Sequence, residues 1–201
     1  MIKFGDILTE ELSSLPEKAK IMIIGRTDTG KSTFIKILAR WFNHRSQKVA
    51  IVDCDIGQSD IGPPGFVSYG ILKSDIISLQ EVDVGRCYMV GDTSPRGREL
   101  QVIAGTEICV GTALKEQIDI IIIDTCGLIK PNRGLEFKCA KAAIIKPDLI
   151  ISFSTPEIQP LSNCLRALGY KVRNVLPFQG VRNKSQDERR QNRISCWNKY
   201  I

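Results

Sequence analysis

The segment Gly25–Thr33 reads GRTDTGKST and matches the G-x-x-x-x-G-K-[ST] pattern of a phosphate-binding loop, or P-loop. Glycines let the backbone curl so that successive N–H groups point at phosphate oxygens. In this pattern Lys31 reaches the β and γ phosphates, and the Ser32 hydroxyl completes the shell of a Mg²⁺ ion. A glycine turn that only joined a strand to a helix would not need this Lys-Ser pair. We therefore predict a site for ATP and Mg²⁺ with the cofactor-binding residues Gly25, Thr27, Asp28, Thr29, Gly30, Lys31, Ser32 and Thr33.

Asp28 is unusual in a loop that binds anions. A carboxylate about 4 Å from a phosphate would cost roughly 4 kcal/mol at an effective dielectric constant near 20. We expect the Asp28 side chain to point away from the phosphates, or to interact with Lys31 or with the acceptor.

Two further aliphatic runs end in acids. Asp53 and Asp55 lie at the end of one run and, by alternation, face the same side. Asp55 can then lie opposite the γ-phosphate, where a carboxylate could orient or deprotonate an attacking hydroxyl. Asp124 ends another run before Thr-Cys-Gly, the usual form of the acid that holds Mg²⁺ in such proteins. We predict Ser32, Asp53 and Asp124 at the metal, and the alternative for Asp53 and Asp55 is a pair of solvated loop aspartates.

The elements that must position these residues alternate between short aliphatic runs and helical segments. The predicted strands are 20–24, 49–53, 87–90, 118–124, 149–153 and 171–176, and the predicted helices are 31–42, 100–114, 134–145, 162–168 and 185–200. Near-continuous Ile/Val runs are typical of strands that are buried on both faces. The pattern predicts an α/β fold of the P-loop NTPase class, a parallel sheet with helices on both faces. Residues 61–84 are the least regular, and we expect them to cover the sheet as a loop or hairpin.

Length and composition favour one packed domain, 1–201. The apolar fraction of 43% and the charged fraction of 25% exclude a wholly disordered chain. The longest strictly aliphatic stretch, Ile120–Ile123, is far shorter than the ~20 residues of a membrane-spanning helix. The seven cysteines show no C-x-x-C spacing and there is one histidine, so we expect buried thiols rather than a zinc site. These features favour a cytoplasmic protein with no membrane partner.

The positive charge is concentrated at one end of the chain. The formal net charge is +6, and residues 171–201 hold 8 basic and 2 acidic residues, which account for all of it. A basic segment on a neutral body suggests an anionic partner. The alternative is a solvated terminal helix.

Four segments, GRTDTGKST, DCDIGQSDIGPPG, GDTSPRGRELQV and IIIDTCGLI, resemble the polynucleotide 5′-hydroxyl kinases, a family that includes the kinase subunit of the eukaryotic mRNA cleavage factor. The resemblance implies transfer of the ATP γ-phosphate to the 5′-OH of RNA or DNA. No obligate protein partner is evident from the sequence. The resemblance also implies Asp55 as the general base beside the catalytic Lys31. Residues 181–201 resemble the family's basic lid, whose catalytic arginines would be Arg189, Arg190 and Arg193.

The resemblance places the acceptor along the residues Gln58, Thr93, Ser94, Arg96 and Leu128. Leu128 stands where eukaryotic relatives often have a tryptophan, and leucine cannot replace base–aromatic stacking of ~1–3 kcal/mol. The flanking domains of eukaryotic members have no counterpart, so the chain looks like the kinase core alone. On the predicted lid helix, Ile194, Trp197 and Ile201 repeat at helical spacing and are expected to dock it on the body.

Two alternatives keep the P-loop and change the function. A P-loop ATPase switch would use ATP to change its affinity for a protein, and a small-metabolite kinase would change only the acceptor. Stimulation of ATP turnover by 5′-OH oligonucleotides, rather than by a protein or a metabolite, separates the three.

Overall fold

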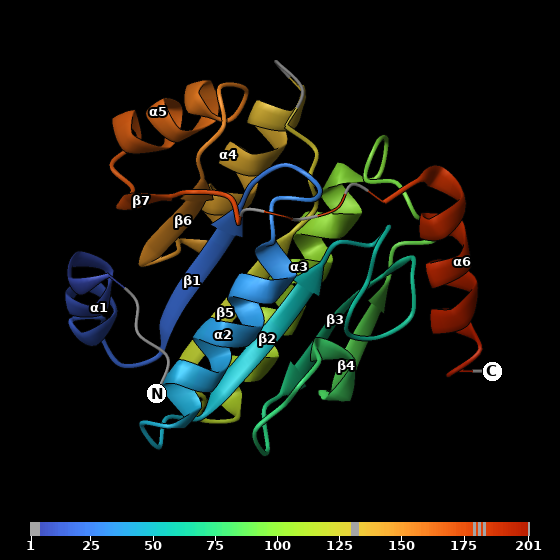
Figure 1. Ribbon diagram of the computed structural model, residues 1–201, viewed down its shortest axis with the longest axis horizontal. Helices are drawn as coiled ribbons and strands as arrows, with labels where there is room; N and C mark the ends of the chain where they lie inside the picture. The colour runs from blue at the N-terminus through green and yellow to red at the C-terminus, as the bar shows by residue number, and fades with distance from the viewer. Residues whose placement is uncertain (1–4, 130–132, 179, 181, 183, 201) are drawn as a thin grey trace.

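The computed structural model describes residues 5–129, 133–178, 180, 182 and 184–200. A seven-stranded sheet with the order β4-β3-β2-β5-β1-β6-β7 runs through the centre of the molecule (Figure 1). The strands are β1 (Ala19–Ile24), β2 (Val49–Cys54), β3 (Phe66–Ile71), β4 (Asp83–Met89), β5 (Ile120–Thr125), β6 (Leu149–Phe153) and β7 (Val172–Val175). The helices are α1 (Asp6–Ser13), α2 (Lys31–Asn43), α3 (Glu99–Lys115), α4 (Arg133–Ile145), α5 (Gln159–Ala167) and α6 (Gln186–Trp197), with a short 3₁₀ turn at Leu79–Glu81.

Helices cover both faces of the sheet, as predicted. The side chains of α2 pack with Ile21, Ile51 and Ile122 on one face, and Leu12 of α1 joins the same core. The helices α3 and α4 pack on the other face against Val52 and Ile123. Because successive side chains of a strand point to opposite faces, the Ile/Val runs supply both cores at once. The predicted fold class is confirmed.

One edge of the sheet differs from the prediction. β3 lies within the segment that was expected to cover the sheet, but it pairs antiparallel with β2. β4 pairs antiparallel with β3 and starts before the predicted 87–90. β3 escaped the pattern because Ser68 and Gly70 interrupt its apolar residues, and only the end of β4 was predicted because this edge strand is mostly exposed. The sheet is therefore parallel from β2 to β7 in spatial order and antiparallel at the β3–β4 edge.

The topology brings the predicted chemistry together. β5 lies between β1 and β2, and Asp53 of β2 is directly beside Asp124 of β5 in the register. The P-loop follows β1, so it starts at the same carboxyl edge. Ligands of open α/β sheets bind beyond this edge.

All seven cysteines are free thiols, and Cys54, Cys109 and Cys126 are buried while the other four are half-buried. Among the described residues, no helix is long and apolar enough to cross a membrane. No group of three or more His, Cys, Asp or Glu side chains within that part of the chain is arranged as a ready metal site.

Candidate active site

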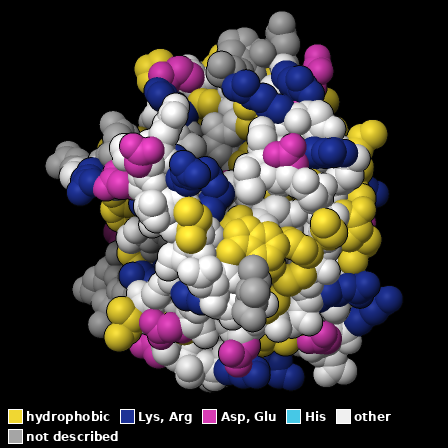
Figure 2. All heavy atoms as spheres, turned by 90° about the vertical axis from the view of Figure 1, so that its right-hand side faces the viewer, with side chains coloured by type: hydrophobic (Ala, Val, Ile, Leu, Met, Phe, Trp, Pro, Cys, Tyr) yellow, Lys and Arg dark blue, Asp and Glu magenta, His cyan; other side chains and the backbone are white. Residues whose placement is uncertain are grey.

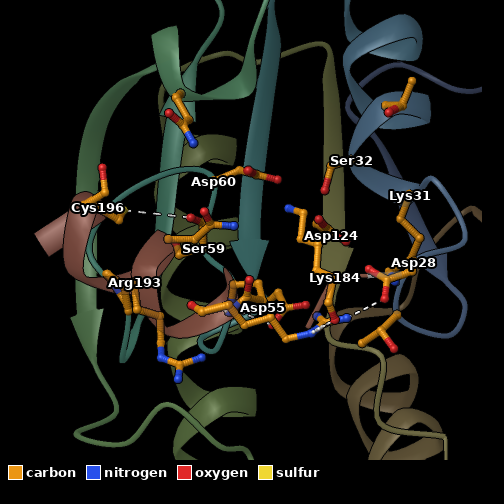
Figure 3. A pocket seen from close by; sticks show the side chains of 18 of the residues that line it. Asp28, Lys31, Ser32, Asp55, Ser59, Asp60, Asp124, Lys184, Arg193 and Cys196 are labelled. Atoms are coloured by element: carbon orange, nitrogen blue, oxygen red, sulfur yellow. Dashed lines mark hydrogen bonds and ion pairs between the residues drawn. The ribbon is translucent and has the colours of Figure 1, made fainter. Parts of the chain in front are cut away.

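A cavity of about 530 Å³ opens at the carboxyl edge of the sheet (Figure 3). Its walls come from the P-loop, the loop after β2, the end of β5 and helix α6. The charged side chains that line it are Asp28, Lys31, Asp55, Asp60, Asp124, Arg182, Lys184, Arg189, Arg193 and Lys199. The site therefore combines acids from the sheet edge with cations from the C-terminal segment.

The P-loop has the backbone shape that its glycines predict. Gly30 has a φ of +91°, and α2 begins at Lys31, the next residue. The ammonium of Lys31 donates to the Arg26 carbonyl oxygen at 2.6 Å. Gly127, after β5, lies so close to the loop that a Cβ there would clash with Thr27. The loop is thus braced by the segment that carries Asp124.

Asp53 is buried and organises the loop that follows it. Its carboxylate accepts hydrogen bonds from the backbone N–H groups of Asp55, Asp60 and Ile61 at 2.9, 2.7 and 2.9 Å, and from the Ser59 hydroxyl at 3.2 Å. Burial, followed by the nearby Asp124 charge, raises the pKa of Asp53 well above its usual range. These four donors already occupy the carboxylate oxygens of Asp53. The metal role of Asp53 is not tested by these contacts and stays a prediction.

Asp124 has a different environment. Its Oδ1 atom is buried and has no hydrogen-bond partner among the described residues. Burial raises the pKa of Asp124 to about 7, and the nearby Lys31 charge opposes that shift. A buried, unpartnered carboxylate oxygen is costly unless a cation or a proton satisfies it.

Asp55 presents its carboxylate to the cavity (Figure 3). Its Oδ1 atom accepts from the backbone N–H groups of Gly57 and Gln58 at 3.3 and 3.2 Å. No hydrogen bond from the described part of the chain reaches Oδ2. One oxygen therefore fixes the side chain, and the other is available to a bound molecule.

Several residues in and around the site were not predicted individually from the sequence, among them Asp60 and Lys138. Asp60 lines the cavity, where burial raises its pKa while a hydrogen bond with Ser32 and the charge of Lys184 lower it. Lys138 of α4 lies behind the site and donates to the Cys126 carbonyl oxygen at 2.7 Å, and burial lowers the pKa of Lys138 to about 8. A third acid in DCDIGQSD was a visible signal for Asp60, whereas a lysine inside a helix gave none for Lys138.

Helix α6 forms the wall opposite the P-loop. Arg189 forms an ion pair with Asp28, and its backbone carbonyl accepts from Gln58 Nε2 at 3.2 Å. Arg193 also lines the cavity, whereas Arg190 is exposed and is not part of the wall. The structure thus brings two of the three predicted arginines to the site.

The docking of α6 differs in part from the prediction. The Trp197 ring packs edge-on against Phe66, with 6.0 Å between the ring centroids, as the helical spacing suggested. Ile194, by contrast, is 45% exposed. Cys196 Sγ donates to the Gly62 carbonyl at 3.4 Å, and the Tyr200 hydroxyl accepts from the Gly62 N–H at 3.1 Å. Ile201 lies outside the described residues. Figure 2 shows this side of the molecule, where hydrophobic side chains gather at the centre with Lys and Arg around them.

Of the predicted acceptor residues, Gln58 alone lines this cavity. The Thr93 carbonyl packs against Gly57, where a Cβ would approach it to 2.6 Å. The Ser94 hydroxyl accepts from the Arg96 N–H at 3.3 Å, within an exposed turn. Leu128 packs against the core between the sheet, α3 and α4. The acceptor roles of these four residues remain predictions.

The fold and the P-loop site together define a P-loop NTPase. The family model described as mRNA cleavage and polyadenylation factor CLP1 P-loop matches residues 25–201. The chain belongs to this family.

Curated relatives carry a more specific name. A polyribonucleotide 5′-hydroxyl-kinase of Pyrococcus furiosus is 36% identical over 193 residues, which is 96% of this chain and 53% of the relative. A polyribonucleotide 5′-hydroxyl-kinase of Methanocaldococcus jannaschii is 33% identical over 187 residues, covering 90% of this chain and 50% of the relative. The chain therefore spans about half the length of the curated relatives it matches.

A solved structure supports the fold independently. A chain in the structure of the wild-type Clp1p–Pcf11p complex superposes with a TM-score of 0.76 at 15% identity, covering 96% of this chain and 51% of that one. At this identity the match shows the shared fold.

Proposed function

We propose that this chain is an ATP-dependent polynucleotide 5′-hydroxyl kinase, which transfers the γ-phosphoryl group of ATP to the 5′-OH of RNA or DNA. The observation that carries the proposal is that the P-loop Lys31, the open carboxylate of Asp55 and the α6 residues Arg189 and Arg193 line one cavity. Phosphoryl transfer depends on positioning and charge neutralisation more than on covalent chemistry by the protein. These residue types supply both.

The P-loop would hold the triphosphate of ATP. Its N–H groups and the N-terminus of α2 favour negative charge, because the helix dipole places partial positive charge there. Lys31 starts α2 and can swing from the Arg26 carbonyl to the β and γ phosphates. The ammonium then balances the charge that develops on the leaving phosphate.

The residues present fit a Mg²⁺ ion. Ser32 offers a hydroxyl in the first turn of α2, and Asp124 offers a buried oxygen that lacks a partner among the described residues. Oxygen donors of this kind are the ligands that Mg²⁺ prefers, and the ion neutralises phosphate charge. We propose Ser32 and Asp124 as its protein contacts, while Asp53 holds the loop that presents Asp55.

Asp55 would act as the base. The acceptor 5′-oxygen attacks the γ-phosphorus, the bond between that phosphorus and the β–γ bridging oxygen breaks, and ADP leaves. The hydroxyl proton passes to the open oxygen of Asp55, which the Gly57 and Gln58 N–H groups hold in place through its other oxygen.

A polynucleotide is the acceptor that the charge distribution favours. The surplus positive charge of the chain lies in residues 171–201, and this segment supplies one wall of the cavity. Cations of this kind pair with backbone phosphates and make binding dependent on salt. The names of the archaeal relatives point to the same acceptor.

The test is ATP turnover by the purified chain with Mg²⁺ and a panel of acceptors. We expect 5′-OH oligonucleotides to stimulate turnover, whereas the same oligonucleotides with a 5′-phosphate, free nucleosides and added proteins do not. EDTA should abolish turnover and excess Mg²⁺ should restore it. Equal turnover with 5′-OH and 5′-phosphate oligonucleotides would contradict the proposal.

A further inference from the structure

The ion pair between Asp28 and Arg189 joins the P-loop to the C-terminal helix across 161 residues of sequence. The Arg189 and Asp28 side chains are only 21% and 13% exposed. A pair sheltered in this way is screened less by salt than a surface pair. This contact is therefore a candidate for control of the position of α6.

Asp28 occupies an unfavourable place for a carboxylate. Its φ is +57°, a left-handed conformation that few residues other than Gly, Asn and Asp adopt readily. It also lies within the loop that would bind the phosphates, where an unpaired negative charge repels them. Pairing with Arg189 neutralises this charge and connects it to the opposite wall of the cavity.

Arg189 is held at a second point. Its backbone carbonyl accepts from Gln58 Nε2 at 3.2 Å, and Gln58 belongs to the loop that presents Asp55. The same residue of α6 therefore contacts both the nucleotide loop and the loop of the proposed base. No other residue of α6 has contacts with both loops among the hydrogen bonds and ion pairs of the described chain.

The rest of α6 provides little anchoring of its own. The helix has no buried residue, and its C-terminal end touches the body through Cys196, Trp197 and Tyr200. Its N-terminal end depends on the contacts of Arg189. Arg193, one turn further along, lines the cavity and has no ion pair or hydrogen bond with the part of the chain that the structure describes.

We propose that Asp28 is a positioning residue that holds α6 closed through Arg189, so that Arg193 is the arginine that meets the transferred phosphoryl group. This inference rests on the proposed function for the role of Arg193. The ion pair between Asp28 and Arg189 is itself observed in the structure. The pairing with Arg189 also explains why a carboxylate is present in a loop that is expected to bind anions.

The proposal differs from simple charge repulsion in a measurable direction. If Asp28 only repelled phosphates, Asp28→Asn would tighten ATP binding. If Asp28 holds α6 closed, the same change opens the helix and ATP dissociates faster. Asn is the suitable substitution because it tolerates the left-handed backbone and keeps the side-chain shape.

The experiment follows α6 through the fluorescence of Trp197. The chain has two tryptophans, so Trp41→Phe leaves Trp197 as the single reporter in every variant. In this background the variants are Asp28→Asn, Arg189→Gln and the double variant. The control is Asp75→Asn, which removes an ion pair with Arg40 outside the cavity.

For Asp28→Asn and for Arg189→Gln we expect acrylamide quenching of Trp197 to rise about twofold and a fluorescent ATP analogue to dissociate about tenfold faster, as for loss of one charged hydrogen bond. The double variant should be no worse than either single variant, because the two side chains act through one contact. The control should match the parent. Tighter ATP binding by Asp28→Asn with unchanged quenching, or additive effects in the double variant, would overturn the proposal.

The readouts keep the two proposals apart. Quenching and ATP dissociation require no acceptor, so they report closure even if 5′-OH transfer were absent. Transfer by the parent with unaltered quenching in both single variants would keep the kinase and overturn the role of Asp28.

Discussion

Helices α2 and α6 face each other across the cavity and are held in opposite ways. α2 buries Lys31 and six hydrophobic side chains, among them Phe34, Ile35 and Leu38, against the sheet. α6 buries none, and it is attached by polar contacts at Arg189 and Cys196 and by the edge-on packing of Trp197 on Phe66. A packed core stores far more free energy than a few polar contacts do.

The two walls of the cavity therefore differ in what holds them in place. The half of the cavity that we propose for phosphates and metal belongs to the core of the molecule, so we expect its geometry to persist without a ligand. Because α6 has no buried residue, we expect that the half that carries the arginines can move without unfolding the sheet. Closure of a lid over a bound nucleotide excludes water and limits wasteful hydrolysis.

The largest effect should come from Lys31→Ala. Loss of the ammonium removes charge stabilisation at the β and γ phosphates, and we expect kcat to fall by about 10³-fold or more. The melting temperature should stay close to that of the parent, since the one hydrogen bond of the Lys31 ammonium among the described residues is to a loop carbonyl. Turnover with γ-labelled ATP and circular dichroism provide the two measurements. Parental turnover by a folded variant would contradict the assignment of the P-loop.

Arg190 and Arg193 lie on the same helix and should differ in their effects on catalysis. Arg193→Ala should lower kcat by about 10³-fold, because an arginine over the transferring phosphoryl group is worth ~10³–10⁵ in related chemistry. Arg190→Ala should change mainly the acceptor KM, in a way that salt suppresses, because Arg190 is exposed. Arg193→Lys should rescue poorly, since a point charge does not reproduce the planar fork. Equal losses at both positions would show that the described wall of the cavity is not the catalytic one.

Asp55→Asn should lower kcat by about a hundredfold with ATP affinity almost unchanged. The amide keeps the shape and can still accept at its oxygen, but it cannot take the proton. Steady-state kinetics at saturating acceptor, together with ATP binding by the variant, measure both quantities. Loss of ATP binding with kcat intact would make the role of Asp55 structural or metal-related.

The smallest effects separate core from lid through stability. Leu38 of α2 is fully buried, so Leu38→Ala should cost about 2–5 kcal/mol of unfolding free energy. Ile194 of α6 is 45% exposed, so Ile194→Ala should cost within about 0.5 kcal/mol. Urea unfolding of the two variants gives the comparison. Similar losses would mean that α6 is part of the core.

Local sequence patterns predicted the P-loop and the buried parallel strands well. The run at Leu149–Phe153 became β6 with the predicted bounds, and the P-loop stands between β1 and α2, because continuous burial leaves a clear apolar signal. β3 left no such signal, since its place depends on antiparallel pairing with β2 rather than on its own composition.

The contacts that complete the site are long-range, and this is why sequence reasoning reached them only in part. The oddity of Asp28 was visible, but its partner Arg189 is far away in the chain. Asp60 enters the cavity because Asp53 holds its backbone N–H, a contact that spacing does not reveal. The docking of α6 by Cys196 and Tyr200 likewise depends on the shape of the turn at Gly62.

Transfer of label from γ-labelled ATP to defined oligonucleotides tests the proposed kinase activity. RNA and DNA oligonucleotides of one sequence, each with a 5′-OH or a 5′-phosphate, are incubated with the chain and Mg²⁺. We predict that label appears at the 5′ end of at least one 5′-OH oligonucleotide, on neither 5′-phosphate form, and not at all with Lys31→Ala. Release of the label only as inorganic phosphate, whichever oligonucleotide is present, would contradict the assignment of this site as a polynucleotide kinase.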